Sequence, residues 1–335
     1  MKHANISLFV PHAGCPNQCS FCNQKVISGS VKPLTPADVR ETLEKASEDN
    51  TSPENTEIAF FGGSFTAIET EYMISLLEEA EPYIKNGRFC GIRVSTRPDA
   101  IDEKVLGILK NYGVTSVELG AQSMDDGVLL KNRRGHTSKD VYDASELIKS
   151  FGFSLGLQMM TGLYGDTDES SVETAKKFIA IRPDTVRIYP TIVLEGTYLG
   201  ELYKENKYFP QTVEEASGLC AVLLKLFYDE NIKVIRLGLH SGGNVEEGYL
   251  SGPYHPAFGE ICESLIYLNE AKKQVSLLNE NINYITLFVN DREISKMTGQ
   301  KGVNKKYFND LGYRVAVRGD GSLKKYQVIV TGEVI

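Results

Sequence analysis

Tryptophan is absent from the 335-residue chain, and cysteine and histidine are scarce, with six and five copies. Six cysteines spread over this length do not resemble the dense framework of a small disulfide-bonded secreted protein. No apolar run approaches the roughly 20 residues that a membrane-spanning helix needs. The segment 1–10 contains one lysine and too short an apolar stretch for a signal peptide. We therefore expect a cytoplasmic protein with no membrane partner.

Basic residues are also in deficit, since 36 Lys and Arg face 44 Asp and Glu, which gives a formal net charge of −8. The sequence pI is about 5.4. A general nucleic-acid binder carries the opposite electrostatic signature. The composition therefore argues against broad binding to nucleic acid, although it still allows a local basic patch.

Three of the six cysteines stand together in the segment CPNQCSFC, as Cys15, Cys19 and Cys22. A [4Fe–4S] cluster normally takes four thiolates, so a group of three leaves one iron open to a ligand that is not protein. A zinc site would need a fourth ligand, usually from a second cysteine pair, and the remaining cysteines are isolated. We predict that these three residues ligate a [4Fe–4S] cluster.

Short apolar strands alternate with amphipathic helices up to about residue 240. Thr35 and Pro36 illustrate the helix signals, because they place an N-cap candidate before a proline at the first helical position. Such alternation predicts a parallel sheet with right-handed crossovers, without separating a barrel from a doubly wound sheet. The predicted strands are 6–10, 57–61, 89–95, 116–119, 154–160, 185–189 and 233–237, and the predicted helices are 36–47, 71–84, 102–112, 139–150, 169–181 and 213–230.

The alternation of strands and helices ends after residue 239, where glycine and proline mark loops. The segment 258–278 predicts one long helix or two short ones. The residues that follow predict a small β-α-β-β unit with a hairpin turn at Asp320-Gly321. We therefore divide the chain into a core at 1–240 and an extension at 241–335.

Glycines and polar residues gather where the predicted strands end. Ligands of parallel α/β folds sit at the carboxyl ends of the strands, and paired glycines let the backbone approach a ligand closely. We therefore expect the binding site at this edge. The segments concerned are 60–65, 95–99, 118–123, 132–137, 156–163 and 186–191.

The cysteine motif, with the aromatic Phe21 before its last cysteine, resembles the signature of radical S-adenosylmethionine (SAM) enzymes. The ordered motifs over about residues 5–240 resemble the radical-SAM domain in the catalytic subunit of the Elongator complex and, more loosely, oxygen-independent coproporphyrinogen oxidase. This resemblance implies a partial (β/α)6 barrel of TIM-like type, closed by the small α+β extension. It also implies a [4Fe–4S] cluster that cleaves SAM to a 5′-deoxyadenosyl radical, an electron donor such as flavodoxin or ferredoxin, and an anaerobic setting.

The resemblance further implies which residues contact SAM. Gly62 and Gly63 occupy the place that binds its amino group, although Ser64 stands where the family has Glu. Gln158 likewise stands where the oxidase family has Asp, and Arg134 has the chemistry to hold a carboxylate. The implied cofactor contacts are Phe21, Gly62, Gly63, Ser64, Thr96, Gln122, Arg134 and Gln158.

Other polar residues stay open between a functional and a structural role. Thr96 is as well suited to begin a helix as to contact a ligand. Tyr189, His240 and His255 are candidates for substrate contact, although a core tyrosine or a lone histidine is more often structural. His12 precedes the cluster motif, and we expect it to hydrogen-bond the cluster loop.

Two classes of function remain. In the first, a radical SAM enzyme of lyase or oxidoreductase type acts on a small molecule enclosed by the extension, such as a deazaguanine-type nucleobase cleaved in salvage. In the second, the enzyme modifies tRNA, as the Elongator resemblance implies. Fewer than 100 residues follow residue 240, and they contain no acetyl-CoA-type glycine turn, so we do not expect Elongator's acetyltransferase half. With the acidic composition, this favours the small-molecule class.

Overall fold

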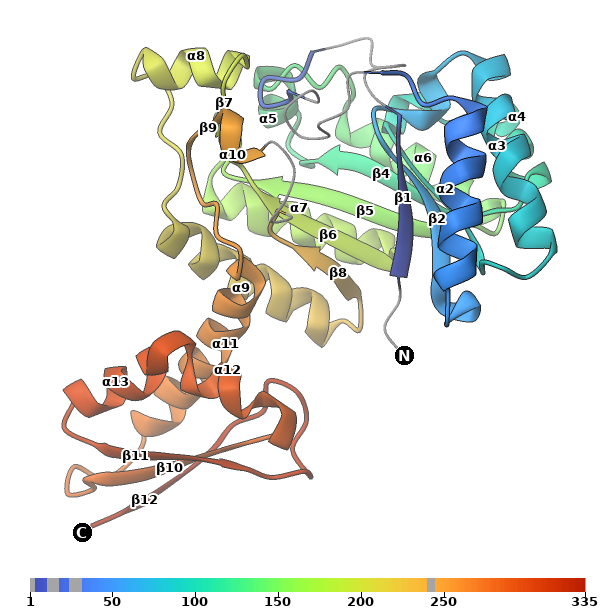
Figure 1. Cartoon of the computed structure of the whole chain (residues 1–335). Coiled ribbons are helices and arrows are strands. Elements are labelled where there is room, and N and C mark those ends of the chain that lie inside the picture. The colour runs from blue at the N-terminus through green and yellow to red at the C-terminus, as the bar shows by residue number, and fades with distance from the viewer. Residues whose placement is uncertain (1–3, 11–17, 24–31, 240–244, 335) are drawn as a thin grey trace.

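The computed structural model describes residues 4–10, 18–23, 32–239 and 245–334. Seven strands form one parallel sheet, in the order β1-β2-β3-β4-β5-β6-β8, which curls into a half-barrel with helices outside (Figure 1). The expected partial α/β barrel is confirmed, and β8 joins the six core strands as a seventh at the edge. These strands are β1 (Ala4–Val10), β2 (Thr56–Gly62), β3 (Gly91–Thr96), β4 (Val114–Gln122), β5 (Ser154–Thr161), β6 (Thr185–Pro190) and β8 (Lys233–Leu237).

The helices follow the predicted alternation closely, and several short elements are added to it. Four of these, α5, α8, β7 and β9, were not predicted, and all lie near the strand ends. The α-helices in the described residues up to 275 are α2 (Pro36–Asp49), α3 (Thr70–Lys85), α4 (Glu103–Asn111), α5 (Asp126–Lys131), α6 (Ser138–Ser150), α7 (Asp168–Ile181), α8 (Tyr198–Lys204), α9 (Val213–Asp229), α10 (Val245–Gly248) and α11 (Phe258–Val275).

The start of α2 shows why these segments become helical. The Thr35 side chain accepts a hydrogen bond from the backbone N–H of Asp38, and the Asp38 carboxylate accepts one from the backbone N–H of Thr35 at 2.8 Å. This reciprocal capping satisfies two amide donors that the first helical turn leaves unpaired. The predicted N-cap at Thr35 is therefore confirmed.

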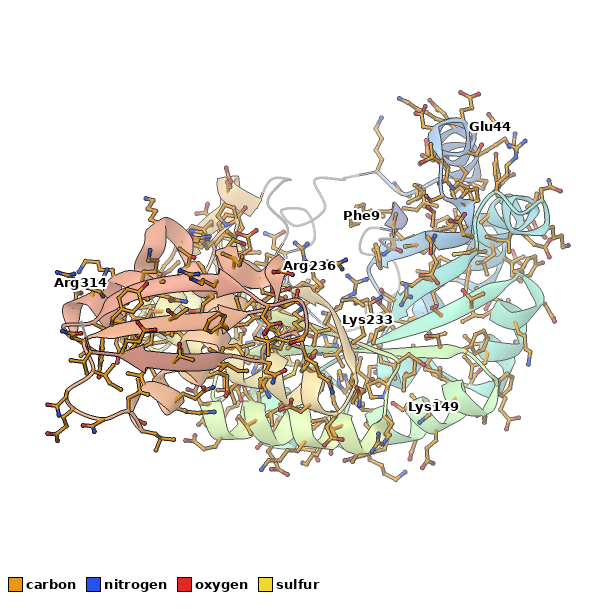
Figure 2. The ribbon with its side chains drawn as sticks, turned by 90° about the horizontal axis from the view of Figure 1, so that it is seen from below. Phe9, Glu44, Lys149, Lys233, Arg236 and Arg314 are labelled. Carbon is orange, nitrogen blue, oxygen red and sulfur yellow. The ribbon has the colours of Figure 1, made fainter. Side chains whose placement is uncertain are left out.

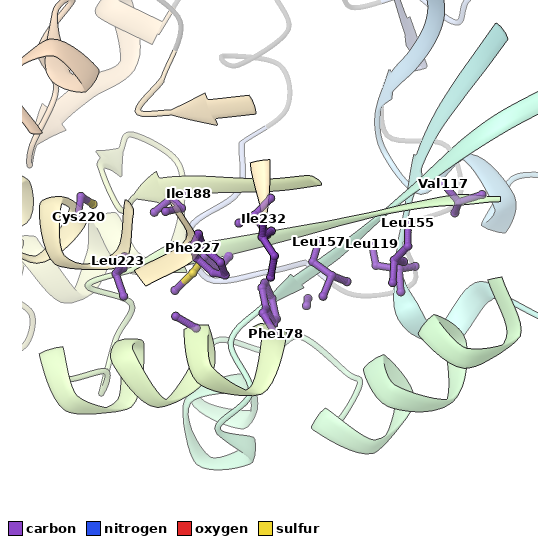
Figure 3. Packing of buried hydrophobic residues seen from close by; sticks show 14 of the residues in the cluster. Val117, Leu119, Leu155, Leu157, Phe178, Ile188, Cys220, Leu223, Phe227 and Ile232 are labelled. Atoms are coloured by element: carbon purple, nitrogen blue, oxygen red, sulfur yellow. The ribbon is translucent and has the colours of Figure 1, made fainter. Parts of the chain in front are cut away.

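The main hydrophobic core lies between the sheet and the outer helices (Figure 3). Leu155 and Leu157 of β5 and Ile188 of β6 pack with Phe178 of α7 and Phe227 of α9, and all five are buried. Because neighbouring residues of a strand point to opposite faces, the residues between these apolar positions face the inside of the half-barrel. That inner face is where polar side chains are free to converge.

Helix α11 packs against α9 and carries the core past residue 240. Phe258, Cys262 and Tyr267 of α11 are at most 2% exposed and belong to the same buried cluster as the strands. The segment predicted as one or two helices is a single helix. The division at residue 240 therefore does not separate two cores, because α11 completes the one around α9.

The C-terminal residues form a separate three-stranded sheet in the order β11-β10-β12. Its elements are β10 (Tyr284–Val289), α12 (Ile294–Thr298), α13 (Val303–Asp310), β11 (Arg314–Gly319) and β12 (Ile329–Glu333). β11 runs parallel to β10, and β12 runs antiparallel to its other side. The predicted hairpin at Asp320-Gly321 is therefore wrong. The chain does turn there, but buried Leu323 and Tyr326 carry it across to the far edge of β10.

Tyr326 fastens this small sheet to the outer helices. Its backbone N–H donates to the Tyr267 hydroxyl at 2.9 Å, and its own hydroxyl donates to Glu263 at 3.0 Å. Its ring also meets that of Tyr228 edge-on, with 4.9 Å between centroids. The small sheet consequently lies against α9 and α11, away from the carboxyl ends of the barrel strands (Figure 1).

A different part of the extension approaches the strand ends. β9 (Tyr249–Ser251) pairs with β7 (Val193–Leu194), which follows β6 directly. The expectation that all of 241–335 closes the barrel therefore needs correction, because the small sheet packs on the outer helices and only the segment around β9 lies near the site. None of the helices in the described segments is long and apolar enough to cross a bilayer.

We expect Phe178→Ala to lower the free energy of unfolding by about 3–5 kcal/mol, because it leaves a large cavity between β5 and α7. Leu277→Ala is a suitable control, since this side chain is 84% exposed and its removal should change stability by less than about 0.5 kcal/mol. Chemical denaturation of both variants measures the difference. Equal stability of the two would contradict the assigned core.

Candidate active site at the carboxyl ends of the strands

The described cysteines of the motif lie in a loop held by two helices. The backbone N–H of Cys22 donates to the carbonyl of Cys19 at 3.2 Å, which closes a turn. Ser20, between them, donates from its N–H to the Asn132 carbonyl at 3.1 Å and from its hydroxyl to Asn132 Oδ1 at 2.6 Å. Leu199 donates its N–H to the Ser20 carbonyl at 2.7 Å. The ends of α5 and α8 thus fix the cysteine loop.

Arg134 connects this loop to the end of β4. Its Nη1 lies 2.9 Å from Cys19 Sγ, and its Nη2 donates to the Gly120 carbonyl at 2.6 Å. The residue is 6% exposed, and its Nε is buried with no hydrogen-bond partner among the described residues. A guanidinium placed in this way is suited to orient a sulfur ligand or to hold an anionic group.

Arg97 in turn holds Arg134. Its Nη2 donates to the Arg134 carbonyl at 2.5 Å, while the Nε and Nη2 atoms each donate to Asp99 at 2.8 Å. The fork onto Asp99 fixes the guanidinium plane. Arg97 therefore acts as a clamp on the backbone that carries Arg134.

His136 is buried beside the same arginines. Its Nε2 lies 3.1 Å from the Ala121 carbonyl, and since a carbonyl only accepts, this nitrogen carries the proton. Nδ1 is buried and has no partner in the described part of the chain. Burial, followed by the positive charge of Arg134, lowers the pKa of His136 to about 4. The imidazole is therefore neutral at physiological pH.

The turn after β2 brings the backbone against the end of β1. Gly62 has φ of +114°, and a Cβ there would lie 2.8 Å from the Val10 carbonyl oxygen. The N–H of Gly63 donates to this same oxygen at 3.0 Å. Only glycine fits at position 62. The predicted glycine pair thus lies next to the chain that leads into the cysteine loop, with Ser64 buried behind it.

Thr96 is engaged within the wall of the site. Thr66 Oγ1 donates to the Ala100 carbonyl at 2.6 Å, so the 2.6 Å contact between Thr66 and Thr96 uses the hydroxyl proton of Thr96. This pair joins the end of β3 to the 3-10 turn η2 (Phe65–Ala67). Thr96 therefore does not begin a helix, because the residue before the next 3-10 turn is Arg97, and its contact with SAM stays a prediction.

Three of the predicted cofactor contacts meet around Gly120. Gln158 Nε2 donates to Gln122 Oε1 at 3.3 Å. A Cβ on Gly120 would lie 2.9 Å from Gln122 Nε2 and 3.6 Å from Nη2 of Arg134. Gln122 also has φ of +68°, a conformation that non-glycine residues rarely adopt. Such backbone strain persists where the surrounding structure enforces it, often at functional sites.

The remaining predicted site residues are placed less centrally. Phe21 packs against the small buried cluster formed by β7 and α8. His255 Nδ1 accepts from the N–H of Ala257 at 3.0 Å, which gives it a structural role at the start of α11. Three residues lie outside the described parts of the chain, namely His12, Cys15 and His240.

Paired charges line the inner face of the half-barrel. Arg93 donates to Glu57 at 2.7 Å and to Glu118 at 3.0 Å, and Arg187 donates to Glu118 at 3.0 Å. Their side chains are 5–11% exposed. Ser95 adds a hydrogen bond to Glu118 at 3.3 Å. Buried charges are tolerated when they are paired in this way, so the network forms a fixed polar floor beneath the strand ends.

Tyr189 and Arg236 face the same interior from β6 and β8. Burial raises the pKa of the Tyr189 phenol, although the charge of Arg187 opposes the shift. Burial also lowers the pKa of Arg236, whose Nε donates to the Gly238 carbonyl at 2.9 Å. No carboxylate pairs with Arg236 in the described ranges, and Figure 2 shows it on the edge strand. The interior therefore offers a neutral phenol and an uncompensated cation.

The strand-end segments of the sequence analysis include Glu118 and Arg187, but the ion-pair network that these residues form with Glu57 and Arg93 was not predicted. Glu57, Arg93, Glu118 and Arg187 each interrupt an apolar strand, and a parallel strand covered on both faces would be apolar throughout. These interruptions were the available signal for an inward-facing polar surface. Asn132 belongs to one of the predicted segments, but its contact with Ser20 could not be predicted, because this contact joins residues far apart in the sequence.

Comparison with known proteins agrees with this arrangement. The profile of the Radical SAM superfamily matches residues 9–178, and that of the Radical SAM C-terminal domain matches residues 183–268. The first match covers half of the chain. The chain belongs to the Radical SAM superfamily.

Two curated proteins are similar to this chain in sequence. It is 33% identical over 180 residues to the tRNA uridine(34) acetyltransferase of Methanocaldococcus jannaschii, which covers 48% of this chain and 33% of that protein. It is 30% identical over 207 residues to Elongator complex protein 3 of Homo sapiens, covering 56% of this chain and 38% of that protein. The chain thus spans about a third to two fifths of the length of these relatives.

A solved structure supports the fold. Methanocaldococcus infernus Elp3, with residues 1–46 deleted, superposes with a TM-score of 0.64 at 22% identity, over 82% of this chain and 64% of that one. The small C-terminal sheet begins at Tyr284, beyond both profile matches.

We expect the free energy of unfolding to fall by roughly 2–4 kcal/mol as the pH drops from 6.5 to 4, because of His136. Its pKa in the folded chain is about 4, so between these values the unfolded chain takes up a proton that the folded chain does not. His136→Gln retains a donor for Ala121 and removes the titrating group. Denaturation at several pH values should show a shallower dependence in the variant, and identical slopes would contradict the assignment.

Proposed function

We propose that Cys15, Cys19 and Cys22 hold a [4Fe–4S] cluster and that the chain acts with it on SAM. Such a cluster supplies the electron that cleaves SAM to methionine and a 5′-deoxyadenosyl radical. The observation that carries the proposal is the contact between Arg134 and Cys19, 2.9 Å long. The orphaned Nε of Arg134 fits a site that receives a further group.

The chain's own residues divide the work of holding these groups. Asn132 fixes the cysteine loop through Ser20, and Arg134 donates a hydrogen bond to a cysteine sulfur. Hydrogen bonds to cluster ligands orient them and tune the reduction potential. Gln122 and Gln158 offer donors and acceptors suited to the hydroxyls and amino group of SAM. An electron donor such as flavodoxin or ferredoxin is part of the proposal.

The first candidate substrate is a small polar molecule, such as a modified nucleobase of the deazaguanine type, cleaved by a lyase. The paired charges below the strand ends support it, since their fixed geometry suits recognition of a polar ligand. Tyr189 and Arg236 are the residues we expect to contact it. The segment around β9 is the part of the extension we expect to shield the site from water.

The second candidate is a tRNA substrate, and the names of the relatives favour it. A tRNA uridine(34) acetyltransferase and Elongator complex protein 3 both match about half of this chain at 30% identity or more. A nucleobase carried on RNA would present the same kind of polar group to the interior as a free base.

We expect Cys15→Ala, Cys19→Ala and Cys22→Ala each to abolish binding of about four irons per chain after anaerobic reconstitution. Cys90→Ala is the control, because Cys90 is exposed and its Sγ donates to the Thr56 carbonyl at 3.3 Å, within the wall of the sheet. Iron analysis and electron paramagnetic resonance measure the outcome. Retention of a complete cluster in any of the three variants would refute the ligand assignment.

We expect Arg134→Ala to weaken SAM binding by about 1.5–3 kcal/mol, the scale of a hydrogen bond to a charged group. Arg40→Ala removes an arginine that pairs with Glu79 on the outer surface and should leave the affinity unchanged. Equilibrium binding to the reconstituted protein measures both. Wild-type affinity in Arg134→Ala would show that this arginine does not line the SAM site.

The decisive assay for the function is formation of 5′-deoxyadenosine by the reduced wild-type protein. A screen of free nucleobases and other metabolites, run beside transcribed tRNA, identifies which substrate stimulates it. Stimulation by a metabolite alone supports the first candidate, and stimulation by tRNA alone supports the second. Absence of any SAM cleavage by a fully loaded cluster would overturn the proposal.

A further inference from the structure

The two faces of the small C-terminal sheet differ sharply. Ile285 and Leu287 of β10 are fully buried in the core. The alternate residues Tyr284, Thr286 and Phe288 point to the other face, where the two aromatic rings are half-buried. Figure 1 shows α11, α12 and α13 on one side of this sheet only. The sheet therefore presents two aromatic side chains on a face that none of the described helices covers.

Arginines flank these rings on the neighbouring strand. In the parallel register, Arg314 of β11 stands beside Tyr284, and Arg318 stands beside Phe288. Both arginines are exposed, and neither has a carboxylate partner among the described residues. Figure 2 shows Arg314 at the rim of the sheet, directed outward. Each of the two aromatic residues thus has an arginine beside it on the adjacent strand.

The charge of this unit is opposite to that of the rest of the chain. Residues 282–335 contain nine Lys and Arg against five Asp and Glu, a net charge of +4. Residues 1–281 contain 27 Lys and Arg against 39 Asp and Glu, a net charge of −12. The negative net charge of the whole chain therefore includes a C-terminal unit that is basic, and a local basic patch attracts polyanions.

We propose that the outer face of β10, β11 and β12 binds single-stranded RNA. Unpaired bases stack on exposed aromatic rings of a sheet, and arginines hold the phosphates or stack on the bases. The face lies away from the barrel mouth, so only an extended ligand can contact both places. This surface deepens the second candidate function and rests on it for its biological purpose, but RNA binding is measurable without radical chemistry.

A structural alternative exists for the arginines. β11 and β12 are the edges of the sheet, and charged residues on edge strands prevent pairing with other chains. This role would require charge but no aromatic ring. Phe288 therefore separates the two explanations, because edge protection gives no reason for RNA binding to depend on it.

The experiment measures binding of a fluorescent single-stranded 12-nucleotide RNA to the full chain with its cluster, without SAM or reductant. Arg314→Gln with Arg318→Gln should weaken binding at least tenfold and make the dependence of log K on log salt shallower by about 1.4, for two lost phosphate contacts. Phe288→Leu should weaken binding roughly fivefold to a hundredfold, for one lost stacked base. Melting curves confirm that the variants are folded.

The matched control is Lys45→Gln with Lys104→Gln, which removes two exposed charges from the outer helices of the barrel. If the control pair weakened RNA binding equally, the effect would be one of overall charge, and the proposal would be overturned. Unchanged affinity in Phe288→Leu would also overturn it, as would binding of anionic vesicles in preference to RNA. If the wild type bound RNA but did not cleave SAM, the result would count against the proposed function. It would still support RNA binding by this surface.

Discussion

The hydrogen bond between Arg134 and Cys19 is the constraint on which the site depends. One guanidinium reaches a cysteine sulfur at 2.9 Å and the Gly120 carbonyl at 2.6 Å, so it connects the cysteine loop to the end of β4. Arg97 fixes the backbone of Arg134 from behind. A loop alone holds ligands loosely, whereas ligands supported by packed elements keep their geometry. The barrel thereby holds Cys19 in a position that the loop could not maintain by itself.

The fold was largely readable from the sequence because its elements are set locally. The Thr35 cap and the apolar periodicity of α3 and α9 predicted helices to within a few residues. The small sheet was not readable in the same way. Which edge of β10 the last strand joins depends on Tyr326, whose burial against Tyr267 and Glu263 involves residues about 60 positions apart. Turn residues at 320–321 predicted a turn correctly and a hairpin wrongly.

Residues of the site could be predicted from the sequence only where they belong to a motif with known chemistry. Gln122, Gln158 and Arg134 were expected at strand ends and do meet there. The charged network on Glu118 was not anticipated, because Arg93 of β3 and Arg187 of β6 reach this one carboxylate of β4 only when the strands are assembled in the sheet. Removing Glu118 would leave the buried Arg187 without its carboxylate partner, while Arg93 would keep Glu57, and an unpaired buried cation costs far more than the loss of an exposed pair. The barrel interior therefore depends on long-range pairing that no single segment reveals.

Net charge was the least dependable guide, because it sums over regions that face different partners. Electrostatic attraction acts over about a Debye length, roughly 8–10 Å at physiological salt. A ligand at the small sheet therefore responds to Arg314 and Arg318 and hardly to the acidic helices beyond it. The −12 of residues 1–281 and the +4 of residues 282–335 describe two surfaces with opposite preferences. An argument from the total of −8 against RNA does not apply to the surface where RNA would bind.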